Sequence, residues 1–148
     1  GLGDVYKRES HKNCKGIFRG VVNACLLAKL NRSCPGAYIM SGEDLANIGP
    51  VALLQDLVVA STLGIESIER NGHHYFAGLS AFPESVQSQI LTTHGDLYTR
   101  TEEGWPTLDL RNGGLDLGTL HAAPLGVGFE LAVEQFTPAS IWRNQHGL

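Results

Sequence analysis

The sequence has 148 residues, which is long enough for one ordinary domain and too short for two large ones. With 43% hydrophobic and 18% charged residues, the composition is typical of globular proteins and excludes a largely disordered chain. The net charge is -4 and no basic stripe is present, so we expect no nucleic-acid partner. No apolar run reaches the roughly 18 residues that a membrane span needs, so we expect no membrane partner either.

The three cysteines are an odd set, and their spacing matches neither a disulfide framework nor a metal site. They are Cys14, Cys25 and Cys34. Reduced thiols are the simplest interpretation of such a set, and reduced thiols are typical of cytoplasmic proteins. We therefore expect a cytoplasmic location.

The chain begins with a polar and charged segment over residues 1–15, where we expect a loop or an irregular start. From residue 16 to residue 31, apolar residues recur with helical spacing and predict a helix. Cys34-Pro35-Gly36 then ends that helix, and a short apolar run over 37–40 predicts a strand.

A second helix and a second strand follow. Pro50 suits the first turn of a helix, and Gly64 suits the left-handed position that ends one. Residues 65–70 then predict another strand. Because helices alternate with strands over short connections, we expect a parallel pair joined by a right-handed crossover.

The second half of the chain has a different character. The segment from Phe82 to Gly95 predicts a third helix, and Asn112-Gly113 between the alternating runs 107–111 and 115–117 predicts a β-hairpin. Residues 124–130 form a glycine-rich turn.

The two halves together predict an α/β fold in which each half contains different kinds of elements. Two parallel strands do not form a stable sheet with two buried faces on their own. We therefore interpret residues 1–82 as a partial (β/α)-barrel segment, containing the last strands and helices of a barrel. Residues 83–148 then form a C-terminal helix, hairpin and glycine-rich tail that pack on the barrel or on a capping region.

Polar side chains follow both expected strands, and we take them as the candidate site. Glu43 and Asp44 follow the first strand, and His73 and His74 follow the second. Parallel strands place these clusters at one sheet edge, where α/β proteins carry their chemistry. Glu43, His73 and His74 are the candidate catalytic residues, since carboxylates and imidazoles serve as acids and bases. The alternatives are carboxylates that cap the next helix and loop histidines bound to backbone. Adjacent histidines in an extended segment point to opposite sides, so we expect one of the two to face the site.

Asp44, Tyr75 and Arg19 are the candidate substrate-binding residues. Tyr75 offers an aromatic pocket wall, with packing on the barrel rim as the alternative. Arg19 suits a bidentate contact with a carboxylate, with a solvated helix position as the alternative. No histidine pair has the spacing of a metal site, so we expect no metal ligands in this chain.

The order of these motifs resembles the C-terminal part of the enolase superfamily, in particular the branch of mandelate racemase and muconate lactonizing enzyme. The resemblance covers roughly residues 16–131 and includes the tail Ala123-Pro124-Leu125-Gly126-Val127-Gly128-Phe129-Glu130. In this comparison Gly42-Glu43 corresponds to the end of the seventh barrel strand and Asn71-Gly72-His73-His74 to the end of the eighth. Glu43 is a departure, because several members carry a catalytic histidine on the seventh strand.

The resemblance implies an enzyme that abstracts a proton next to a carboxylate. Its substrate would be a hydroxy acid or acid sugar, and its reaction a dehydration, racemization or cycloisomerization. The family implies Mg²⁺ held by ligands outside this chain, so the 148 residues alone are expected to be inactive.

Two other hypotheses remain open. The first is a non-catalytic α/β module that self-associates through an open sheet edge, and a homo-oligomer is expected in either case. The second is a small metal-free enzyme that uses Glu43, Asp44 and His74.

Overall fold

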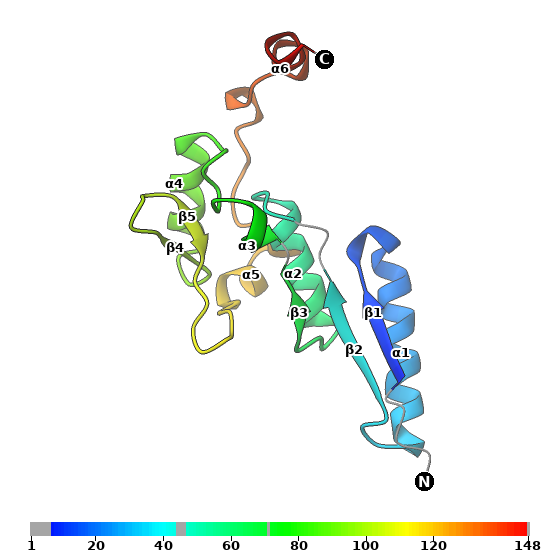
Figure 1. The fold of residues 1–148 in the computed structure, drawn as a ribbon. Coiled ribbons are helices and arrows are strands. Elements are labelled where there is room, and N and C mark those ends of the chain that lie inside the picture. Colours follow the sequence, from blue (N-terminus) through cyan, green and yellow to red (C-terminus); the bar gives the residue numbers. More distant parts are fainter. Residues whose placement is uncertain (1–6, 44–46, 71, 148) are drawn as a thin grey trace.

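The computed structural model describes residues 7–43, 47–70 and 72–147. Its N-terminal half contains a parallel sheet in the order β1-β2-β3, shown in Figure 1. These strands span Lys7–His11, Tyr38–Glu43 and Ile68–Glu69. The register pairs His11 with Gly42 and Glu43 with Glu69.

The first strand, β1, corrects two of the sequence-based expectations. We expected a loop over residues 1–15 and two parallel strands, but Lys7–His11 is paired along its length with β2. This segment contains no apolar residue, so it lacks the alternation that marks a strand. Its backbone is instead ordered by hydrogen bonding to the edge of β2. The other expected strand, 65–70, is shorter than predicted and comprises only Ile68–Glu69.

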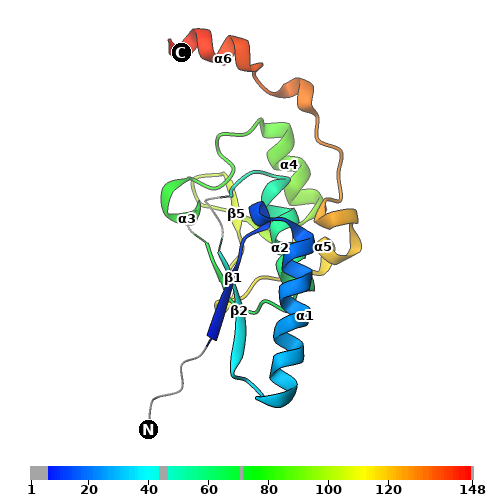
Figure 2. The same cartoon turned by 90° about the vertical axis from the view of Figure 1, so that its right-hand side faces the viewer.

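Two helices connect the strands, and both confirm the prediction made from the helical spacing of apolar residues. They are α1, Ile17–Ser33, and α2, Ala52–Thr62. Gly64 follows α2 with a φ of 72°, as the expected left-handed helix end requires. Figures 1 and 2 show α1 and α2 on the same face of the sheet, and no described helix covers the opposite face of β1 and β2.

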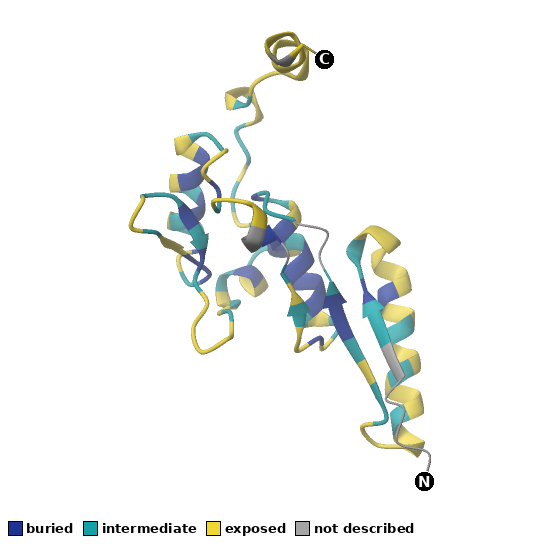
Figure 3. Ribbon diagram, in the orientation of Figure 1, coloured by how far each residue is buried: buried dark blue, intermediate teal, exposed yellow. Residues whose placement is uncertain are grey.

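The two helices differ in what they bury. Figure 3 shows α2 largely buried and α1 largely exposed. Apolar side chains of α1 such as Phe18, Val22 and Leu26 face solvent, whereas Leu53, Leu54 and Leu57 of α2 belong to the core. The core therefore lies between α2 and the C-terminal half of the chain.

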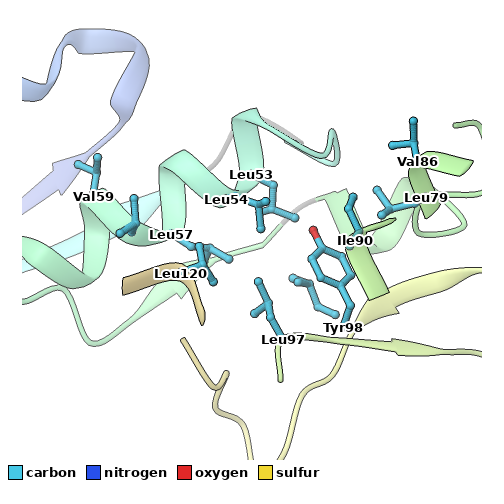
Figure 4. Close-up of a cluster of buried hydrophobic side chains, with 12 residues drawn as sticks. Leu53, Leu54, Leu57, Val59, Leu79, Val86, Ile90, Leu97, Tyr98 and Leu120 are labelled. Atoms are coloured by element: carbon cyan, nitrogen blue, oxygen red, sulfur yellow. The ribbon is translucent and has the colours of Figure 1, made fainter. Parts of the chain in front are cut away.

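The C-terminal half supplies the other side of this core (Figure 4). Its buried apolar residues include Leu79, Val86, Ile90, Leu97, Tyr98 and Leu120. They come from short elements and the connections between them. The contributing elements are α4 Glu84–Thr93, β4 Tyr98–Arg100, β5 Pro106–Leu108 and α5 Gly118–Ala122, and a short helix, α3 Gly72–Tyr75, precedes them. The expected third helix is confirmed as α4.

The expected hairpin over 107–117 is wrong in its position. The antiparallel ladder joins β4 to β5. Asn112 and Gly113 do form a tight turn with φ values of 52° and 77°, but only an isolated bridge between Arg111 and Gly114 closes it. The second run, 115–117, does not pair as a strand, because Leu115 and Leu117 pack against the core instead.

The chain continues after α5 through three small elements. Helix α6 extends away from the rest of the molecule in both views (Figures 1 and 2). These elements are η2 Pro124–Gly126, η3 Val133–Gln135 and α6 Ala139–His146. Within the described ranges, no helix has the length and apolar character required to cross a membrane.

Two contacts fix α1 to its neighbouring strands. The Asn31 side chain forms two hydrogen bonds with the backbone of Tyr38, its Nδ2 donating to the carbonyl at 2.8 Å and its Oδ1 accepting from the amide at 3.0 Å. Gly20 lies against the ring of His11, where an added Cβ would come within 2.6 Å of a ring carbon. The small residue at position 20 therefore sets the approach of α1 to β1.

Candidate functional site

The carboxyl ends of the three parallel strands meet at one edge of the sheet, and each brings a charged side chain there. Lys12 follows β1, Glu43 is the last residue of β2, and Arg70 follows β3. This edge is the place at which the sequence predicts a site.

Glu43 is held by two partners at this edge. One carboxylate oxygen, Oε2, forms an ion pair with Lys12 Nζ at 2.7 Å, and the other, Oε1, accepts a hydrogen bond from Ser10 Oγ at 2.6 Å. The contact with Lys12 lowers the pKa of Glu43, and the Ser10 hydroxyl lowers it further. Glu43 is therefore an ionised acceptor near neutral pH, and it must release a partner before it takes up a proton.

The partners of Glu43 were not identified from the sequence. Glu43 in turn raises the pKa of Lys12, so the ammonium stays protonated and can donate a hydrogen bond. Lys12 and Ser10 lie in the polar segment that we expected to be a loop. The alternation of Glu9, Ser10 and His11 gives no apolar signal, so only the pairing of β1 with β2 reveals them.

His11 also lies at this edge, but its contacts are structural. Its side chain is buried, and Nε2 is 2.9 Å from Asn13 Oδ1. The amide of Asn13 donates to the backbone carbonyl of Gln55 at 3.4 Å. His11 therefore links β1 to α2 through Asn13.

Arg70 is held on the far side of the same edge. Its guanidinium lies 3.4 Å from Asp56 Oδ2 and donates to the carbonyl of Asn47 at 3.1 Å. The two charged side chains are 11% and 6% exposed, so the pair is largely desolvated. Arg70 also lines a pocket between the N-terminal and C-terminal halves of the chain.

The remaining predicted residues are not brought together with Glu43 among the described contacts. Arg19 is exposed in the first turns of α1, and Tyr75 is 75% exposed at the end of α3. Asp44 lies outside the described residues. His73 and His74 lie in α3, so the expectation of an extended segment there is wrong, and their side chains are outside what the structure describes. Neighbours on a helix are rotated by about 100° and do not point to opposite sides.

The described residues do not fit a metal centre. They contain no group of three histidine, cysteine, aspartate or glutamate side chains arranged to hold an ion.

A second polar cluster lies deep in the C-terminal half. His94 is fully buried, its Nδ1 lies 2.9 Å from Thr119 Oγ1, and the Thr119 hydroxyl donates to Asp96 Oδ1 at 2.5 Å. Nδ1 therefore carries the proton, and Nε2 accepts from the Gly128 amide at 3.3 Å. Burial lowers the pKa of His94, against a smaller opposing effect of Asp96. Both ring nitrogens are satisfied, so this histidine fixes the tail at Gly128 and is not available for catalysis.

Comparisons with protein-family models, with curated proteins and with solved structures find no match to this chain. The resemblance to the enolase superfamily accordingly rests on the order of the sequence motifs.

Proposed function

We propose that this chain forms part of an enolase-superfamily-like (β/α)-barrel enzyme that acts on a hydroxy acid or acid sugar by removing a proton next to its carboxylate. The observation that carries the proposal is the one-sided cover of the parallel sheet. The strands are in sequential order, and α1 and α2 both lie on one face.

One-sided cover favours a barrel over an open sheet. Open parallel sheets have helices on both faces, whereas in a barrel the helices cover the outer face and the inner face is filled by side chains of the closed ring of strands. Ile39, in the central strand β2, is 43% exposed, which is high for an apolar residue of a parallel sheet. Further strands that close a barrel would supply the missing cover.

The charged edge fits such an enzyme in its position. Barrel enzymes place their catalytic residues at the carboxyl ends of the strands, where Glu43 and Lys12 meet. In this proposal ionised Glu43 accepts a hydrogen bond from a substrate hydroxyl, and protonated Lys12 stabilises the negative charge that develops on the substrate. His73 and His74 remain the candidates for proton transfer. The Mg²⁺ that the family uses would need ligands beyond the described residues.

Solvent deuterium exchange tests this proposal. The full-length natural protein is incubated in D₂O with Mg²⁺ and a panel of hydroxy acids and acid sugars, and mass spectrometry detects deuterium at the carbon next to the carboxylate. We expect exchange with at least one acid and a loss of about 10- to 100-fold in Glu43→Gln, the range for one hydrogen bond to a charged group. Glu69→Gln is the matched control, because Glu69 pairs with Glu43 in register but is exposed on β3.

Two results would contradict the proposal. The first is an absence of exchange with every acid in the panel, and the second is equal activity of the Glu43→Gln and Glu69→Gln proteins. The 148-residue chain by itself is expected to show no exchange. Metal-dependent turnover by that chain would overturn the assignment of the metal ligands to a region outside it.

A second candidate function is self-association as a non-catalytic module, and the surface of α1 favours it. Phe18 is 89% exposed, and Val22 and Leu26 continue its apolar stripe at four-residue spacing. Sedimentation equilibrium measures the mass in solution, which we expect to exceed that of a monomer and to fall in Phe18→Ser. Val133→Ser, at an exposed apolar site away from α1, is the control, and a monomeric wild type contradicts this candidate.

A further inference from the structure

The central strand β2 is longer than its neighbour β3, so part of its edge is open (Figure 1). Gly42 donates its backbone N–H to the carbonyl of Ser67 at 2.9 Å, and the pairing of β2 with β3 begins there. The backbone groups of successive strand residues alternate between the two edges of the strand. Tyr38 and Met40 therefore turn their backbone groups to the same edge as Gly42, at a level that β3 does not reach.

The fold satisfies the first of these two residues and leaves the second open. Both backbone groups of Tyr38 bond to the side chain of Asn31, which takes the place of a neighbouring strand. Within the described ranges, the N–H and C=O of Met40 form no hydrogen bond with the connection 63–67 on that side. Buried strand groups are normally paired, so Met40 presents an available donor and acceptor side by side.

The connection that precedes β3 is held away from Met40 by its attachment to α2. Ile65 donates its backbone N–H to the carbonyl of Ala60 at 3.0 Å, and its side chain is buried. The segment 65–67 therefore continues from the end of α2 and does not extend β3, although the sequence predicts a strand from residue 65. The open edge is a consequence of this attachment.

A groove between α1 and this connection borders the open edge. Its free volume is about 420 Å³, which lies in the range of small-ligand sites. The residues that line it include the small or apolar Ala24, Ala28 and Leu63, together with Met40. Among its described lining residues, Glu66 carries the only charge. The register that pairs β2 with β3, carried back by two residues, places Glu66 level with Met40.

A ligand of this groove has to match the backbone of Met40 and the charge of Glu66. A donor and an acceptor in strand geometry are matched by the N–H and C=O of one residue in an extended peptide. At the first residue of a peptide the donor is a charged ammonium group, which favours a position beside a carboxylate.

We propose that this groove binds the amino end of an extended peptide, whose first residue pairs with the backbone of Met40 and whose ammonium group lies beside Glu66. The peptide adds a short strand to the open part of β2. This proposal is independent of the catalytic one, because Glu43 lies at the opposite end of β2.

Amide hydrogen exchange tests the open edge in the free protein. In the ¹⁵N-labelled protein we expect the amide of Met40 to exchange at least about tenfold faster than those of Ile39 and Ser41, which turn toward β1. Similar protection of all three amides would show that Met40 is already bonded, and would overturn the proposal.

Titration with trialanine amide, a peptide with a free amino end, tests the ligand. We expect the amide proton of Met40 to shift downfield and to become protected from exchange, because it gains a hydrogen bond. An absence of change at Met40 with peptide up to about 10 mM would leave water as the occupant and overturn the proposal.

The N-acetylated form of the same peptide tests the role of the charge. It lacks the ammonium group, and we expect it to bind about two- to fivefold more weakly, the range for an exposed ion pair. Glu66→Gln should weaken binding of the free peptide by a similar factor and leave binding of the acetylated peptide unchanged. Glu69→Gln, at an exposed position of β3, is the matched control. Equal affinities of the wild type and Glu66→Gln for the free peptide would overturn the placement of its ammonium group.

Discussion

Glu43 has a different type of contact at each of its two carboxylate oxygens, and the two contacts can be separated by mutation. Lys12 contributes a hydrogen bond and a charge, whereas Ser10 contributes a hydrogen bond alone. Both lower the pKa of Glu43, and Lys12 has the larger effect. The ionisation of this carboxylate therefore depends on a residue from the neighbouring strand segment.

A carboxyl NMR titration tests this order of effects. We expect Lys12→Met to raise the pKa of Glu43 toward its ordinary value of 4.5, and Ser10→Ala to raise it less. The cause is the loss of a positive charge in the first variant and of a neutral donor in the second. A larger change in the Ser10→Ala protein would show that the ion pair is not the main influence.

His94 should make the stability of the protein depend on pH in the mildly acidic range. Its folded pKa is lower than the ordinary value of 6.5, because burial disfavours the charged ring. Below about pH 6.5 the unfolded chain therefore binds the proton more readily than the folded chain. As the pH is lowered from there, the free energy of unfolding decreases until the pH is below the folded pKa. Above about pH 6.5 both states are neutral, and the contribution of His94 is constant.

Thermal unfolding between pH 4.5 and pH 7.5 checks this prediction. We expect the wild type to lose stability on acidification and His94→Gln to show a shallower dependence, from a lower starting stability. His121→Gln is the control, because His121 is exposed. Equal slopes for the wild type and His94→Gln would rule out His94 as the source.

At the scale of elements, the sequence predicts the helices and turns whose formation depends on residues close together along the chain. The helices α1, α2 and α4 have apolar side chains at helical spacing, and all three were found. The strand β1 has no such pattern and is ordered by long-range pairing with β2. The turn at Asn112-Gly113 was predicted correctly. The strands expected on either side of it do not pair, because Leu115 and Leu117 pack against the core.

The same distinction applies to the candidate site. Glu43 was predicted because it ends an apolar strand, but its partners, Ser10 and Lys12, come from a segment 31 to 33 residues earlier in the chain. The Arg70–Asp56 pair was missed as well, because it joins the end of β3 to the side of α2. Contacts of this kind follow from the strand order and not from local composition.

The β4–β5 hairpin depends on a glycine outside it. Gly78 has a φ of 49°, and an added Cβ would lie 2.1 Å from the carbonyl oxygen of Pro106. We expect Gly78→Ala to destabilise the protein by about 2–4 kcal/mol, since it adds a backbone clash to an unfavourable φ.

Gly113→Ala is the matched control for this element. Gly113 also has a positive φ, 77°, but a Cβ there meets nothing within 4 Å. We expect a cost of only about 1 kcal/mol from the backbone conformation. Urea unfolding of both variants measures the difference, and similar costs would mean that the contact with Pro106 relaxes without loss.

At the scale of the whole molecule, stability is concentrated in the middle of the chain. The buried core draws on residues from Leu53 to Leu120, and α6 contributes none of them. Phe136 of the tail packs against this core, and its ring lies edge-on to Phe82 at 6.1 Å. Because α6 supplies no residue of this core, we expect it to add little to folding.

Two truncations test this division. Removal of residues 137–148 is expected to change the free energy of unfolding by less than about 0.5 kcal/mol. Removal of residues 128–148 also deletes Phe129 and Phe136, which pack on the core, and should cost several times more. Equal stabilities of the two truncated proteins would place the tail outside the cooperative unit altogether.

The bond between Asn31 and Tyr38 has a consequence for chemical modification of the surface. Asn31 begins the sequence Asn31-Arg32-Ser33, which is an acceptor site for N-linked sugar. In the fold, its amide nitrogen already donates to the Tyr38 carbonyl. A glycan attached to that nitrogen before folding would remove one of its two hydrogens and place a bulky group where α1 meets the start of β2. Passage of this chain through a glycosylating compartment would therefore weaken the junction that sets the beginning of the central strand.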